Sequence, residues 1–128
     1  MTYLLDTHVF LWLLRDPQKL PAKVRGISLD HGAVLLLSII TPWEMAIKSG
    51  IGKLNAADIL DDFDAFAARG NYLLLATTTE QVIRGGRLPL YHRDPFDRLL
   101  VAQALDLGIP IVSNDAVLDL YGVQRIWA

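Results

Sequence analysis

The chain contains no cysteine, which excludes a disulfide framework, a thiolate zinc site and a cysteine nucleophile. This absence fits the reducing environment of a cytosol. Long hydrophobic runs are also missing, since a stretch such as 33–37 is far too short to cross a bilayer. The first five residues carry none of the basic side chains that begin a secretion signal. We therefore expect a soluble cytoplasmic protein with no membrane partner.

Positive charge is not in excess either. Twelve Lys and Arg residues against fourteen Asp and Glu give a net charge of −2. A nucleic acid would therefore have to be bound through a local basic patch or through cations. Hydrophobic residues make up 52% of the 128 residues. One domain, residues 1–128, can bury a core without disulfides or metal, and we expect part of the apolar surface to meet a partner.

Hydrophobic periodicity predicts strands that alternate with helices along the whole chain. The expected strands are one that ends at Leu4 and Leu5, then 33–37, 72–76, 109–112 and 124–127. The expected helices are 9–14, 21–29, one from a Thr41–Glu44 capping box to Gly50, 56–69, 79–83 before the break at Gly85 and Gly86, 94–107, and a brief one after Asp115. This alternation predicts an α/β protein, a three-layer α/β/α sandwich with a mostly parallel central sheet.

The helix 94–107 begins with two carboxylates. Asp94 has the position of a helix cap, Pro95 that of the first helical residue, and Asp97 lies in the first turn. Leu99 and Leu100 recur further along at helical spacing, so we expect their packing to fix the direction of Asp97.

Four of the acidic residues follow predicted strands or begin the next helix, where open parallel sheets bind ligands. They are Asp6, Glu44, Asp97 and Asp115. Carboxylates of this kind suit Mg²⁺ or Mn²⁺. Each could instead serve only its own helix N-terminus, for a gain of about 0.3–1 kcal/mol. If the fold brings them together, their repulsion exceeds that gain unless a cation or protons are bound. Both interpretations stay open on the pattern alone.

Four motifs in order resemble those of PIN domains, in particular VapC-type toxins of type II toxin–antitoxin systems. The motifs are LLDTH at 4–8, TPWEMAIK at 41–48, DPFDRLLVAQA at 94–104 and IVSND at 111–115. The resemblance covers essentially the whole chain. It implies a PIN-like fold and an endoribonuclease that depends on Mg²⁺ or Mn²⁺, is silenced by a cognate antitoxin, and is a homodimer.

The resemblance also implies a set of site residues. The catalytic and metal-binding residues would be Asp6, Glu44, Asp97 and Asp115, supported by Thr7, Ser113 and Asp94. Asp94 could support the site or only cap its helix. Metal held by these acids would activate a water for attack on the phosphodiester. Since the sequence offers no cysteine and no obvious serine–histidine pair, direct attack by water is favoured.

Positive charge is concentrated before and within the start of the acidic helix. The candidate RNA-binding residues are Arg84, Arg87, Arg93 and Arg98. They could guide RNA phosphates or only be solvated, and Arg98 could also pair with neighbouring carboxylates. The aspartates at 58, 61, 62 and 64 are expected on a solvated helix face. His8 is expected to be packed. The apolar segment 9–14 and the helix with Trp43, Met45 and Ile47 are candidate surfaces for a second copy or the antitoxin.

Three other functions also fit parts of the pattern. A phospho-accepting receiver needs a lysine near the last strands, but the last lysine is Lys53. A haloacid-dehalogenase-type phosphatase needs an aspartate two residues after Asp6, where His8 stands. The remaining alternative is a non-catalytic PIN-like module that binds RNA or protein, against which the presence of all four acids argues.

Overall fold

The computed structural model describes residues 1–128, and its strands form one parallel sheet. The elements in chain order are β1 (Thr2–Leu5), α1 (Thr7–Arg15), the 3₁₀ helix η1 (Pro17–Lys19), α2 (Ala22–Leu29), β2 (Val34–Ser38), α3 (Ile40–Gly50), α4 (Ala57–Leu60), α5 (Phe63–Arg69), β3 (Tyr72–Leu75), α6 (Thr79–Arg87), α7 (Pro95–Leu107), β4 (Ile111–Val112), the 3₁₀ helix η2 (Ala116–Tyr121) and β5 (Arg125–Ile126). The strand order is β3-β2-β1-β4-β5.

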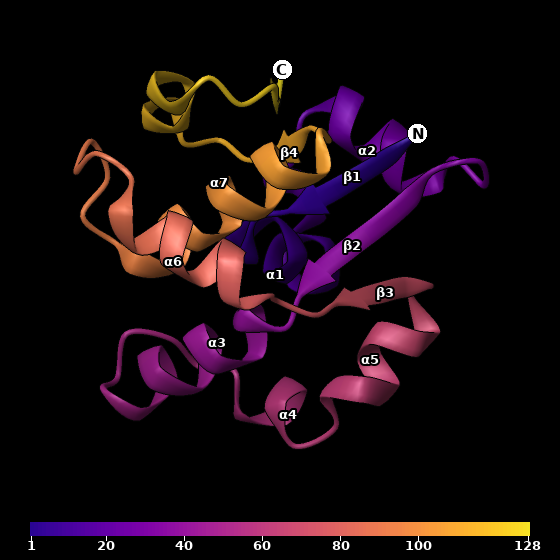
Figure 1. The fold of residues 1–128 in the computed structure, drawn as a ribbon. Helices are drawn as coiled ribbons and strands as arrows, with labels where there is room; N and C mark the ends of the chain where they lie inside the picture. Colours follow the sequence, from indigo (N-terminus) through magenta and orange to yellow (C-terminus); the bar gives the residue numbers. More distant parts are fainter.

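Alternation along the central strands sends successive side chains to opposite faces of the sheet. Leu5 and Val112 pack with α1, α2, α4 and α5 in one buried cluster. Leu4 and Ile111 pack with α7 and η2 in a second. Helices therefore cover both faces, which confirms the predicted three-layer α/β/α sandwich, and α6 and α7 lie side by side on the second face (Figure 1).

Three helix predictions were wrong in detail. Thr41 does not cap α3, because its side chain is buried 3.4 Å from the Thr7 hydroxyl, and the Ser38 hydroxyl instead accepts the Ile40 N–H at 3.2 Å. The expected helix 56–69 is two helices, α4 and α5, broken at residues 61–62. Two consecutive aspartates are poor helix formers, and the break lets each short helix bury its own apolar residue, Ile59 or Phe63.

The third difference concerns α6, which continues through Gly85 and Gly86 to Arg87. A Cβ atom built on Gly85 would lie 3.1 Å from the Cα atom of Leu99. Glycine therefore permits the close approach of α6 to α7 there, and it does not break the helix.

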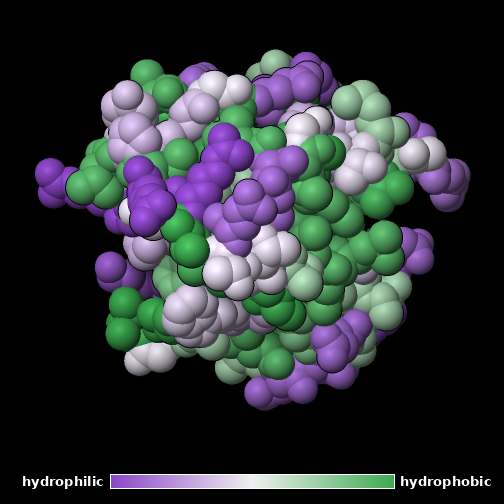
Figure 2. Space-filling model, in the orientation of Figure 1, coloured by the Kyte–Doolittle hydropathy of each residue, from purple (hydrophilic) through white to green (hydrophobic).

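Hydrophobic surface remains exposed outside the two clusters. Figure 2 shows it extending over the side of the molecule at which β2 and β3 lie, where Val34 and Leu73 are exposed. Trp43 is also exposed, at 58%, but Met45 is fully buried. In the segment 9–14, Val9, Phe10 and Leu11 belong to the core, whereas 12–14 are half-buried. None of the helices is both long and apolar enough to cross a membrane.

Candidate active site

The predicted acids gather at the carboxyl ends of the central strands. Asp6 follows β1, Asp115 follows β4, and α7 brings Asp94 and Asp97 to the same place. A polar cavity of about 570 Å³ lies among them. Its lining consists of Asp6, His8, Trp12, Lys48, His92, Asp94, Asp97, Asn114, Asp115 and Ala116. The strand order thus brings together side chains that are more than a hundred positions apart in the sequence.

Asp6 is the most buried acid in the cavity wall, with 4% of its surface exposed. Its Oδ2 accepts a hydrogen bond from the Ser113 hydroxyl at 2.7 Å, whereas its Oδ1 is buried and has no hydrogen-bond partner. Burial raises the pKa of Asp6 despite the hydrogen bond from Ser113, and the charge of Glu44 adds to the rise. One carboxyl oxygen of Asp6 is therefore buried without a hydrogen bond of ordinary geometry, although the backbone N–H of His8 also acts on the carboxyl group and lowers its pKa.

Glu44 is not among the residues that line the cavity and is only 1% exposed. Its Oε1 accepts a hydrogen bond from the Thr7 hydroxyl at 2.7 Å, and its Oε2 accepts one from the Lys48 ammonium. The Lys48 Nζ also lies 3.3 Å from Asp94 Oδ2. Burial lowers the pKa of Lys48, but its hydrogen bonds and charge pairs with Glu44 and Asp94 outweigh that effect and raise the pKa. Lys48 is therefore a cation in contact with two of the acids.

The two carboxylates of α7 have different surroundings. Asp94 Oδ1 accepts the Phe96 N–H at 2.9 Å, so Asp94 caps the helix. Asp97 faces the cavity with 17% of its side chain exposed. Burial, followed by the charges of Asp6, Asp94 and Glu44, raises the pKa of Asp97 to about 8. The carboxylates are thus close enough to oppose each other's ionisation.

His92 connects Asp97 with Asp115. Its Nε2 lies 2.7 Å from Asp115 Oδ2 and 3.1 Å from Asp97 Oδ2. The backbone N–H of Asp94 donates to Nδ1 at 3.1 Å, which assigns the proton of a neutral ring to Nε2. Asp115 Oδ1 accepts the Val117 N–H at 3.1 Å and caps η2.

Sequence reasoning missed Lys48 as a neighbour of the acids, and it grouped His92 with the basic side chains near the site without predicting its direct contacts with Asp97 and Asp115. The signal for Lys48 was available, because it follows Glu44 by four residues on one helix face. No local signal identified His92, whose contact with Asp115 joins a loop to the end of β4. His8 was also misjudged, since it is exposed at the cavity beside Trp12.

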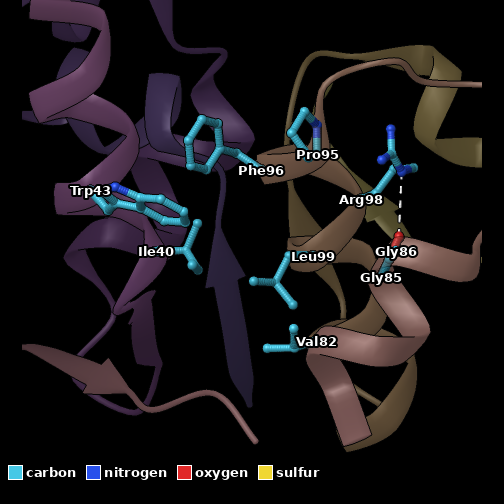
Figure 3. Close-up of a pocket in the computed structure, with 9 residues that line it drawn as sticks. All are labelled: Ile40, Trp43, Val82, Gly85, Gly86, Pro95, Phe96, Arg98 and Leu99. Carbon is cyan, nitrogen blue, oxygen red and sulfur yellow. Dashed lines mark hydrogen bonds between the residues drawn. The ribbon is translucent and has the colours of Figure 1, made fainter. Parts of the chain in front are cut away.

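The four arginines fall into two groups. The side chains of Arg84, Arg87 and Arg93 are exposed. Arg98 donates to the backbone carbonyls of His92 and Arg93, each at 3.0 Å, and to that of Gly85 at 3.3 Å (Figure 3). It therefore holds the loop before α7 in place, and the expected pairing of Arg98 with carboxylates is not observed.

An apolar groove of about 200 Å³ lies between α3 and the pair α6 and α7. Ile40 and Trp43 line one side, and Val82, Phe96 and Leu99 face them (Figure 3). The Trp43 and Phe96 rings meet edge to face, with centroids 5.1 Å apart.

A hard divalent cation fits the polar cavity. Asp6 Oδ1 is a buried carboxyl oxygen without a hydrogen-bond partner. Burial and then the charges of Asp6, Asp94 and Glu44 raise the pKa of Asp97, and a bound cation relieves such repulsion between carboxylates. His92, Asp97 and Asp115 present ligand atoms within 4.8 Å of one another. Oxygen donors dominate the set, as Mg²⁺ and Mn²⁺ prefer.

The chain belongs to the PIN domain family, whose model matches residues 3–123. Its fold is similar to that in the structure of VapBC2 from Rickettsia felis bound to a DNA fragment from their promoter, with 15% identity over 100% of both chains and a TM-score of 0.70. VapBC-1 from nontypeable Haemophilus influenzae is 20% identical over 98% of this chain and 97% of the other, with a TM-score of 0.68. FitAcB from Neisseria gonorrhoeae is 17% identical over 97% and 96%, with a TM-score of 0.65. A comparison with curated protein sequences gave no match.

Proposed function

We propose that this PIN domain is a Mg²⁺- or Mn²⁺-dependent endoribonuclease, the toxin of a VapBC-type toxin–antitoxin pair, and that it acts in the cytoplasm. The observation that carries the proposal is the unpartnered Asp6 Oδ1, which lies in a polar cavity shared with Asp97. Membership in the PIN family supports a nuclease rather than another use of an acidic site.

The side chains have distinct roles in this proposal. Asp6 and Asp97 offer oxygens to the cation, and Ser113 holds Asp6 through its 2.7 Å hydrogen bond. A divalent cation bound there would polarise the scissile phosphodiester and lower the pKa of a water. Glu44 and Thr7 support the site from within through their own hydrogen bond. His92 orients Asp115 toward the cavity.

RNA would be bound from the exposed side of the cavity. Arg84, Arg87 and Arg93 are exposed on the segment that leads into α7, and guanidinium groups suit phosphate oxygens. Because the net charge of the chain is −2, this local patch and the cation would have to supply the attraction for RNA.

The proposal includes an antitoxin and a second copy of the chain as partners. The similar structures are named as VapBC and FitAcB assemblies. The apolar groove and the exposed Trp43 and Val82 offer the kind of surface into which an amphipathic helix can dock.

Cleavage of total cellular RNA in Mn²⁺ or Mg²⁺, compared with the same reaction in EDTA, tests the proposal. The parent should cut with metal only, and Asp6→Asn and Asp97→Asn should each lose activity at least a hundredfold, on the order expected for a lost catalytic group. Asp64→Asn, on the exposed face of α5, is the matched control and should cut like the parent. Binding of RNA without cleavage by the parent would favour the non-catalytic module, and cleavage in EDTA would exclude the metal mechanism.

A further inference from the structure

We infer that Lys48 takes the place of a second divalent cation in the acidic cluster, so that the site binds a single ion through Asp6 and Asp97. This inference rests on the proposed function, because it concerns the cation of that same site. It also assigns roles to Glu44, Asp94 and Asp115 that differ from direct metal binding.

The argument begins with the carboxylate oxygens that the protein already uses. Glu44 gives one oxygen to Thr7 and the other to Lys48. Asp94 caps α7 with one oxygen and faces Lys48 with the other. Each oxygen of these two acids therefore already has one hydrogen-bond donor of the protein beside it.

Asp115 is occupied in the same way on the other side of the cavity. Its Oδ1 accepts the Val117 N–H, and its Oδ2 faces His92 Nε2 at 2.7 Å. Each of its oxygens thus also has a donor beside it, although its half-buried side chain lines the cavity and belongs with His92 and Asp97 to the group whose ligand atoms lie within 4.8 Å of one another.

Two carboxylate oxygens remain without a donor. Asp6 Oδ1 is buried and unpartnered, and Asp97 makes its one contact through Oδ2, at 3.1 Å from His92. Mg²⁺ and similar ions keep several waters and take one or two carboxylates from a protein. Asp6 and Asp97 together therefore match the needs of one ion.

Lys48 explains why a second ion is not expected beside Glu44. Its ammonium lies between Glu44 and Asp94, at hydrogen-bond distance from one oxygen of each. A divalent cation that used these two acids would have to displace the ammonium or bear its repulsion at close range. The ammonium is well held, because Lys48 and Glu44 lie four residues apart on α3 and the Lys48 side chain is only 25% exposed.

Counting bound Mn²⁺ on the metal-stripped full chain tests this inference. The electron paramagnetic resonance signal of free Mn²⁺ reports how many ions each chain removes from solution. The parent should bind one ion, Lys48→Arg should also bind one because it keeps the positive charge, and Lys48→Met should bind a second because Glu44 and Asp94 lose their counter-ion. Asp97→Asn should lose the first ion.

Two bound ions in the parent, or a single ion in a folded Lys48→Met variant, would overturn the inference. If circular dichroism shows that Lys48→Met does not fold, the number of Mn²⁺ ions bound by the parent still tests the inference. Two ions together with Mn²⁺-dependent RNA cleavage would overturn only the role of Lys48. One bound ion without metal-dependent cleavage would overturn the proposed nuclease and leave the count standing, and no binding at all would overturn both.

Discussion

Replacing Asp97 with asparagine should stabilise the metal-free protein while abolishing its metal site. The pKa of this carboxyl rises from 3.8 to about 8 through burial and the charges of Asp6, Asp94 and Glu44. In the unfolded chain the carboxyl ionises near its ordinary pKa, but in the folded chain it holds its proton. The folded state therefore binds more protons between these two values, and stability falls as the pH rises through this range.

The size of the effect follows from the shift. Each pKa unit corresponds to about 1.4 kcal/mol, so the free energy of unfolding of the parent should fall by about 4 kcal/mol between pH 4 and pH 7 on account of Asp97 alone. Neighbouring carboxylates that take up protons reduce this value. We therefore expect Asp97→Asn to exceed the parent by about 2–4 kcal/mol at neutral pH and to match it near pH 3.5.

Urea denaturation in EDTA at several pH values measures this difference. Asp64→Asn serves as the control, because an exposed acid on α5 should change stability by less than about 0.5 kcal/mol at every pH. Added Mn²⁺ should stabilise the parent but not Asp97→Asn, since only the parent binds the ion in its folded state. An advantage of Asp97→Asn that is absent at pH 8, or that does not grow from pH 4 to pH 8, would refute the reasoning.

Two further predictions concern the packing that positions α7. Leu100→Ala, at a fully buried site, should lower the free energy of unfolding measured in urea by about 2–5 kcal/mol. It should also lower RNA cleavage, because the packing that positions Asp97 is weakened. Full activity in a clearly destabilised variant would contradict that coupling. Gly86→Ala should stabilise the chain by about 0.5–1 kcal/mol, because its Cβ meets nothing within 4 Å. Gly85→Ala should instead be less stable than Gly86→Ala, because its Cβ approaches the Leu99 backbone to 3.1 Å. Equal thermal midpoints for the two variants would contradict this prediction, because they would show that α7 moves away from α6 without loss of stability.

Much of the fold followed from local patterns. The strands, the order of the helices and the cap at Asp94 were predictable, because period-two and helical spacing of apolar residues and the chemistry of helix termini act over a few positions. The errors came where tertiary packing prevailed over such signals. Thr41 turns its hydroxyl toward Thr7 rather than capping α3, and Gly85 lets two helices approach closely rather than breaking α6.

The amino-acid sequence by itself determined the alternation of strands and helices, the parallel architecture and the places of Asp6, Asp97 and Asp115, which follow a strand or lie in the first turn of a helix. Only the tertiary structure decided which carboxylate oxygens are free. Lys48 reaches Asp94 across 46 positions, and His92 reaches Asp115 across 23. These contacts depend on how α3, α7 and the end of β4 pack together, and no local pattern encodes that. The same packing leaves Asp6 Oδ1 buried without a partner.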